Sequence, residues 1–443
     1  MFLIAGHLED IEYLWPLVRN KTRSYEDQNS MFHLAASKGH ANLAKFFHGK
    51  FFHKPELLVN ASHDTPLHVS VKSNHYDFTK ALLEVLKENS PRNKRNETPL
   101  HLAVIHQRYE IVQLLLSFVK DKSPKDITER IPIHYAAMKG DLPMLRLFNC
   151  QVDTFDARDK NGYFPLHYAV KNGHQEVVEY ICERTQNPDA LTYDKDSVLH
   201  FPAVQGHTEM MKVLLSRITK KNVQNHDGKT PLHNAISHKN TEIALLLIQD
   251  PDVKVSLSDE LDNTPLHLAA ISGELEVIKA LIRRDNVDIY AEDFQKNCAL
   301  HVAVKNGQAE TFEFLVDLYK SIPVDENLRT PLHLAAKCGH LRIVKKIVNN
   351  LDPQNMTPKD RWRNTPLHYA AEEGHLEVVK VLINRAKEKM PLNNSGYCPL
   401  DLARTYDKKQ VAKYLKSYLG EERVKIFDNR FKRPKEVQGY KQF

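Results

Sequence analysis

The chain has 443 residues, of which 27% are charged and 42% hydrophobic, and its mean hydropathy is −0.49. It contains no run of about 18 apolar residues, which excludes a recognisable membrane-spanning helix. The apolar start MFLIAGHLED lacks a basic leader and is a poor signal peptide. The net charge of +6 lies at the carboxyl end, where residues 404–443 hold 12 Lys and Arg against 5 Asp and Glu. An anionic partner would therefore bind the tail and not the body.

Five cysteines are scattered along the chain without a C-x-x-C pair. They are Cys150, Cys182, Cys298, Cys338 and Cys398. This pattern favours free thiols in a reducing compartment over a disulfide scaffold or a zinc site. We expect the cytoplasm, with the nucleus as the alternative.

A tetrapeptide resembling TPLH recurs along the chain every 32 to 35 residues. Its histidines are His33, His68, His101, His134, His167, His200, His233, His267, His301, His333 and His368. A twelfth copy, CPLDLA, has Asp401 in the histidine's place, and the opening AGHLEDIEYLWPLV matches the second half of a unit. The predicted division is a partial unit over 1–24, twelve units over 25–420 with the last as a C-terminal cap, and a basic, flexible tail over 421–443.

Each unit is predicted to form two short helices. In the copy RNTPLHYAAEEGHLEVVKVLI (363–383), Thr365 is a good N-cap and Pro366 suits the first helical position. Gly374 is the residue type that usually follows a helix C-terminus. In the next segment Val378 and Leu382 lie on one helical face, which predicts the second helix.

A two-helix unit of this size cannot bury its apolar face alone, so successive units must stack into a solenoid. The T-P-L-H-x-A signature resembles that of ankyrin repeats, and the resemblance covers about residues 1–420. It implies an all-α solenoid of stacked antiparallel helix pairs with projecting β-turn fingers. It also implies that the eleven TPLH histidines form hydrogen bonds within and between repeats.

Two units depart from the pattern. The unit at 192–224 reads SVLHFPAVQGH, with Pro202 inside the first helix, which predicts a distorted helix and a bend in the stack. The segment LDPQNMTPKDRW (351–362) carries two prolines and predicts an extended finger.

The 24 histidines invite a metal-binding or catalytic interpretation. Their repetition in two fixed slots, as in His368 and His375, favours a structural role instead. His48 and His53 form a pair without a third ligand nearby. The sequence has no P-loop, serine-hydrolase or zincin motif. We therefore expect no enzymatic activity, cofactor or metal.

The resemblance implies that protein partners bind the fingers and the exposed side of each first helix. Trp362, flanked by Arg361 and Arg363, is the strongest candidate because Trp, Tyr and Arg dominate interface hot spots. The alternative is that its ring folds back onto the neighbouring finger. The other finger candidates are Phe294, Arg329, Tyr163 and Tyr193.

An apolar residue near the end of several first helices suggests a second binding feature. These residues are Ile105, Met138, Val204 and Ile271, and a stripe of them would suit an extended peptide or a helix face. Lys171 and Ser237 interrupt the series. The alternative is that they are isolated apolar residues, which are common on protein surfaces.

The sequence favours a monomeric, non-enzymatic scaffold that binds partner proteins of unknown identity. One alternative is contact with nucleic acid or an acidic membrane through the basic tail, which contains RFKRPKE (430–436). Another is that the chain is a fragment of a larger ankyrin-bearing channel, toxin or enzyme.

Overall fold

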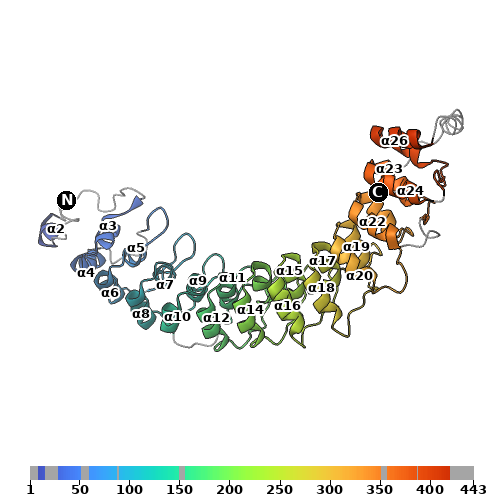
Figure 1. The fold of residues 1–443 in the computed structure, drawn as a ribbon. Helices are drawn as coiled ribbons and strands as arrows, with labels where there is room; N and C mark the ends of the chain where they lie inside the picture. The colour runs from blue at the N-terminus through green and yellow to red at the C-terminus, as the bar shows by residue number, and fades with distance from the viewer. Residues whose placement is uncertain are drawn as a thin grey trace. The chain divides into compact units, whose positions relative to one another are not determined.

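The computed structural model describes residues 8–14, 28–50, 59–86, 89–148, 155–350, 357–386 and 388–419 (Figure 1). The chain divides into two compact units, Met1–His226 and Asp227–Phe443. Within the described ranges all regular secondary structure is helical, as the sequence predicts. We number the repeats 1 to 12 by the residue in the TPLH slot, from His33 to Asp401.

Helices of the first unit alternate between a first and a second helix of each repeat. After α2 (Leu8–Leu14), the first helices are α3 (Met31–Lys38), α5 (Pro66–Lys72), α7 (Pro99–Ile105), α9 (Pro132–Lys139), α11 (Pro165–Lys171) and α13 (His200–Gln205). The second helices are α4 (Ala41–Lys50), α6 (Tyr76–Leu83), α8 (Tyr109–Phe118), α10 (Leu142–Leu147), α12 (Gln175–Cys182) and α14 (Thr208–Leu215).

The second unit repeats this alternation. Its first helices are α15 (Pro231–Ser237), α17 (Pro265–Ser272), α19 (Ala299–Lys305), α21 (Pro331–Cys338), α23 (Pro366–Glu373) and α25 (Pro399–Thr405). Its second helices are α16 (Thr241–Gln249), α18 (Leu275–Ile282), α20 (Ala309–Val316), α22 (Leu341–Asn350), α24 (Leu376–Arg385) and α26 (Lys409–Leu419).

Within each unit the first helices pack side by side in one row and the second helices in another (Figure 1). The core lies between the two rows. In repeat 4, for example, Ala136 and Ala137 on α9 are fully buried, as are Met144 and Leu145 on α10. Because alanine side chains are small, they allow the close approach of the two helices that a short unit needs.

Local signals fix the ends of the first helices. Thr98 is the N-cap of α7, Pro99 follows it, and the Thr98 backbone N–H donates to Nδ1 of His101 at 3.1 Å. Cys298 and Cys398 take the same cap position in repeats 9 and 12. The four described cysteines are free, and Cys150 lies outside the described residues.

The TPLH histidine also joins each repeat to the next. The Nε2–H of His101 donates to the Arg130 carbonyl at 3.0 Å, one repeat further on. The same bond links His33, His68, His134, His233, His267, His333 and His368 to the following repeat. Among the described histidines, His167 and His301 are buried with no hydrogen-bond partner for Nε2.

The histidine of the Gly-His pair contacts the C-terminal end of the first helix in the preceding repeat. His174 donates from Nε2 to the Met138 carbonyl at 3.1 Å, and its ring covers Gly140 of the preceding repeat. Gly140 has φ of +71°, and a Cβ there would lie 2.4 Å from Nδ1 of His174. Glycine is therefore required both by its left-handed backbone and by the adjacent ring.

The fingers are tight turns that begin eight residues before the TPLH histidine. In repeat 11 the Asp360 carboxylate accepts the backbone N–H groups of Trp362 and Asn364 at 2.9 and 2.7 Å. One backbone hydrogen bond joins successive fingers, as between the Phe294 N–H and the Leu261 carbonyl at 3.2 Å. No corresponding bond forms between the described fingers of repeats 9 and 10. The TPLH histidines of these two repeats have the shortest spacing in the chain, 32 residues.

Pro202 shortens its helix at the start. The sequence predicts a distorted helix, and α13 has only six residues and begins at His200, two positions later in the unit than α11. Because the helix starts late, Pro202 falls in the first turn, where N–H groups have no intrahelical acceptor.

Three sequence predictions concern residues beyond the described part. Residues 351–356 of the extended finger and His53 lie outside it, as does the basic tail from residue 420 onward. The boundaries near residues 24 and 420 therefore stay predictions.

Candidate functional site

Four successive fingers of the second unit each present one large apolar side chain to solvent. Leu261 is 53% exposed, Phe294 57%, Leu328 50% and Trp362 46%. We call these four residues the apolar finger row. The turns beneath them are held by the carboxylates of Asp259, Asp293, Asp325 and Asp360. The side chains are therefore displayed on an ordered backbone.

The finger of repeat 11 is bound on both sides. Arg361 donates from its backbone N–H to the Asn327 carbonyl at 3.0 Å and from Nη2 to the Glu326 carbonyl at 3.0 Å. On the other side the Trp362 carbonyl accepts the Asn394 N–H at 2.9 Å. Arg363 is exposed and has φ of +58°. Trp362 thus lies between two cations on a turn whose backbone is fixed.

Arg329 differs from the other finger candidates because its charge is paired within its own repeat. Its Nε donates to Oδ2 of Asp325 at 2.7 Å, and Asp325 is buried. Breaking this pair would leave a buried carboxylate without its partner, which is costly. Arg329 is therefore less available to a partner than Arg361.

The two tyrosines predicted in the first unit have different environments. Tyr163 is half-buried, with its ring centroid 5.2 Å from that of Tyr168 and 5.9 Å from that of Phe201. Lys171 lies over the same ring at 5.3 Å, and burial raises the pKa of Tyr163. Tyr193, in contrast, is 57% exposed at the tip of its finger.

The first-helix candidates do not form one continuous stripe. Ile105 and Met138 are half-buried in adjacent repeats of the first unit, while Val204 is exposed two repeats further on. Ile271 is half-buried and belongs to the second unit.

The sequence interpretation missed half of the apolar finger row. Leu328 occupies the fourth place of its finger, with φ of +60°, where glycine or a polar residue is usual. Leu261 occupies the third place. Nearby, Tyr290, Ile322 and Val324 in the connecting loops are also exposed. A leucine at a turn position that favours polar residues was the available signal.

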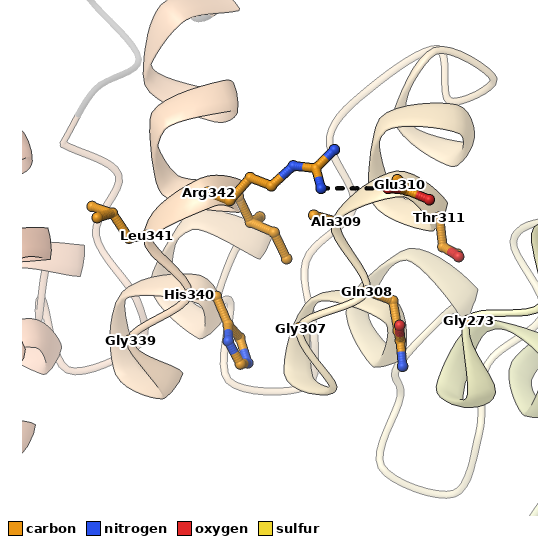
Figure 2. Close-up of a pocket in the computed structure, with 11 residues that line it drawn as sticks. Gly273, Gly307, Gln308, Ala309, Glu310, Thr311, Gly339, His340, Leu341 and Arg342 are labelled. Carbon is orange, nitrogen blue, oxygen red and sulfur yellow. Dashed lines mark hydrogen bonds and ion pairs between the residues drawn. The ribbon is translucent and has the colours of Figure 1, made fainter.

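His340 of the Gly-His slot contacts the preceding repeat. Figure 2 shows a hollow of about 500 Å³ lined by Gln308, His340 and Arg342 beside the starts of α20 and α22. Nε2 of His340 donates a hydrogen bond to the Lys305 carbonyl at 3.2 Å, and Arg342 forms an ion pair with Glu310 at 3.4 Å. Both polar side chains thus serve contacts between repeats. In the described part of the chain no group of three metal-ligating side chains comes together.

Burial is the main cause of the altered pKa values. Desolvation lowers the pKa of His134 and of His333 to about 4. It raises the pKa of Cys298, whose thiol lies at a helix cap. These groups are held in their neutral forms by the interior of the stack.

The family assignment rests on sequence comparison together with this architecture. A family model described as "Ankyrin repeats (3 copies)" matches residues 3–85, 32–126, 118–192, 199–293, 266–357 and 332–426. The chain belongs to the ankyrin repeat family. Ankyrin repeats are generally protein–protein interaction modules. The crystal structure of the human ASB11 ankyrin repeat domain is similar, with 25% identity and a TM-score of 0.43 over 50% of this chain and 96% of that one.

A search of curated proteins by sequence found no match. In the described residues no helix combines the length and apolar character needed to span a membrane.

Proposed function

We propose that this ankyrin repeat protein is a non-enzymatic scaffold that binds a partner protein through the apolar finger row of its second unit. The observation that carries the proposal is the succession of Leu261, Phe294, Leu328 and Trp362 on four consecutive fingers, each about half exposed. Exposed aromatic residues such as Trp362 and Phe294 suit this role because Trp, Tyr and Arg dominate interface hot spots. Trp362 is the anchor, and Arg361 and Arg363 supply a polar rim.

The remaining sequence candidates have secondary roles in this proposal. Ile271, near the end of α17, extends the surface onto the first helices of the second unit. Ile105, Met138, Val204, Tyr163 and Tyr193 belong to the first unit and contribute to a separate contact. We place the protein in the cytoplasm or the nucleus and expect it to act as a monomer.

A photo-crosslinking experiment tests the proposal. A benzophenone amino acid at position 362 should capture one or a few proteins from lysate of the source organism, and the same label at Tyr193 should not capture them. The double variant F294A/W362A should then weaken binding of the captured partner at least thirtyfold, since a loss of about 2 kcal/mol is expected for a hot spot.

Tyr193→Ala is the matched control, because Tyr193 is an equally exposed aromatic residue on a finger of the other unit. Thermal unfolding of each variant verifies that it is folded. Retention of the partner by F294A/W362A, with loss from a chain that ends at Gly420, would move the function to the basic tail.

A further inference from the structure

The first unit contains a band of cations that is separate from the apolar finger row. It consists of Lys72, Lys94, Arg95, Arg108 and Lys139, from repeats 2 to 4. We call it the basic band. Lys94 and Arg95 are exposed at the tip of one finger, and the other three lie at or just beyond the ends of α5, α7 and α9.

Lys72 stands in the middle of the basic band. Its Nζ pairs with Oδ2 of Asp64 at 2.6 Å, but the lysine side chain is 38% exposed whereas that of Asp64 is 3% exposed. The second Asp64 oxygen accepts the Asn93 side-chain amide at 2.9 Å. Both oxygens of the buried carboxylate are therefore occupied, while the lysine side chain stays partly exposed.

A cavity of about 350 Å³ lies beside Lys72, between the fingers of repeats 2 and 3. Lys94 and Arg95 line it, together with Ser62, Asn93 and the buried Glu97. The finger is held in place because the Lys94 N–H donates to the Ser62 carbonyl at 3.0 Å. Oε2 of Glu97 accepts the Asn93 amide at 2.9 Å, so this carboxylate is already hydrogen-bonded.

The other side of the basic band surrounds His106. Burial, followed by the positive charges of Arg108, Lys72 and Lys139, lowers the pKa of His106. Nη2 of Arg108 donates to the Lys72 carbonyl at 3.2 Å, while its buried Nε has no hydrogen-bond partner. Lys139 donates to the Ile105 carbonyl. The Arg108 guanidinium is thus held close to two other cations.

Acidic side chains are distributed differently from these cations. In repeats 2 to 4, Asp64, Glu97, Asp126 and Asp141 are buried and accept hydrogen bonds. The exposed acids Asp77 and Glu110 lie on the second helices α6 and α8, and the exposed Glu129 on the finger of repeat 4 pairs with Lys125 at 3.1 Å. Excess positive charge therefore remains on the finger and first-helix side.

We propose that the basic band binds an acidic segment of a partner protein in the polyproline II conformation, with carboxylates on every third residue. Neighbouring first helices pack about 8–10 Å apart, and a polyproline II helix has three residues per turn and rises about 3.1 Å per residue. Three residues therefore match one repeat, and every third side chain faces the same way. One carboxylate enters the cavity lined by Lys72, Lys94 and Arg95, and the following two meet Arg108 and Lys139 in turn.

A peptide is favoured over nucleic acid by the lining of the cavity. It contains no aromatic side chain on which a base could stack. The buried Glu97 in its lining would also repel a continuous polyphosphate more strongly than separated carboxylates.

A peptide-display selection on the full chain tests this proposal. A random 12-residue library is selected in parallel on the native chain, on K94E/R95E and on the control K345E/K413E, which reverses two exposed charges on α22 and α26 of the second unit. Peptides from the native chain should be enriched in Asp and Glu at positions i, i+3 and i+6. The best of them should bind at least tenfold more weakly to K94E/R95E and within threefold of native to K345E/K413E.

Three results would overturn the proposal. One is a selection without acidic enrichment, and another is acidic peptides that bind K94E/R95E as tightly as the native chain. The third is a 12-residue oligothymidine that competes for the basic band more strongly than the acidic peptides, which would identify a nucleic-acid surface. The finger variant F294A/W362A should leave acidic-peptide binding unchanged, so this proposal and the proposed scaffold function can fail independently.

Discussion

The finger edges of the two units are built in the same way but present different chemistry. In repeat 3 of the first unit, Lys94 and Arg95 occupy the second and third places of the turn. In repeats 9 and 11 of the second unit these places hold Phe294 and Trp362. Both kinds of turn are closed by the side chain of the first residue and joined to the preceding finger by one backbone hydrogen bond.

This comparison shows that the scaffold and the binding surface depend on different positions of the repeat. The first finger residue, the TPLH histidine and the helix-ending glycine determine the backbone. The second and third finger residues contribute little to it, so they are free to vary in charge and polarity. We therefore expect changes at the shared positions to affect both units alike, and changes at the finger tips to affect one surface only.

The largest expected effect comes from acid, which acts on a feature that both units share. The pKa of a histidine is ordinarily 6.5, and burial lowers it to about 4 for His134 in the first unit and for His333 in the second. Below pH 6.5 the unfolded chain takes up protons that these folded histidines resist. The contribution of these histidines to the free energy of unfolding is therefore fully present above pH 6.5. It decreases as the pH falls toward about 4, by roughly 2 kcal/mol per histidine at pH 5.

Hydrogen exchange with urea titration at pH 7.5, 6.0 and 5.0 would measure this loss in each unit separately. Both units should lose protection together, because each contains several such histidines. A chain that is equally stable at pH 7.5 and 5.0, or one that loses a single unit only, would contradict the shared mechanism.

A smaller effect is expected from the glycines that end the first helices. Gly140→Ala in the first unit and Gly339→Ala in the second should each destabilise the chain by about 1–3 kcal/mol, because a Cβ is placed on a left-handed backbone. The φ angles are +71° and +76°, and the added Cβ would also meet the rings of His174 and His375. Denaturant midpoints give the comparison.

Ser73→Ala is the control for the glycine variants, because Ser73 ends its helix with an ordinary φ of −78°. Repeating Gly140→Ala with His174→Ala separates the two causes, since the backbone strain remains when the ring is removed. Glycine variants no less stable than Ser73→Ala would show that the left-handed ends are not needed.

The smallest effect distinguishes regular from irregular junctions within each unit. His134→Ala removes bonds to both the Ile131 N–H and the Tyr163 carbonyl, whereas His167→Ala removes only the bond from the Phe164 N–H. We expect His134→Ala to cost about 1 kcal/mol more, the usual net value of one hydrogen bond. His267→Ala and His301→Ala form the matching pair in the second unit.

Equal unfolding midpoints for His134→Ala and His167→Ala would show that the bond to the next repeat adds no stability. A difference in one unit but not in the other would show that the two units do not use the histidine in the same way.

The sequence alone determined the helix pairs, their ends and the family. Thr98, Pro99 and His101 interact within four residues of one another, so their arrangement can be predicted from their spacing. Cys298 and Cys398 at the cap positions follow from the same local logic. The late start of α13 did not follow, because it depends on how the chain accommodates Pro202.

Tertiary structure decided which of the varying residues remain available to a partner. The sequence predicts that Arg329 and Tyr163 are finger residues available to a partner. In the structure Arg329 pairs with Asp325, and Tyr163 packs against Phe201 of the next repeat. Leu328, which the pattern did not single out, is half exposed. The exposure of Tyr163 depends on a side chain of the next repeat, and the local spacing of a motif does not encode such a contact.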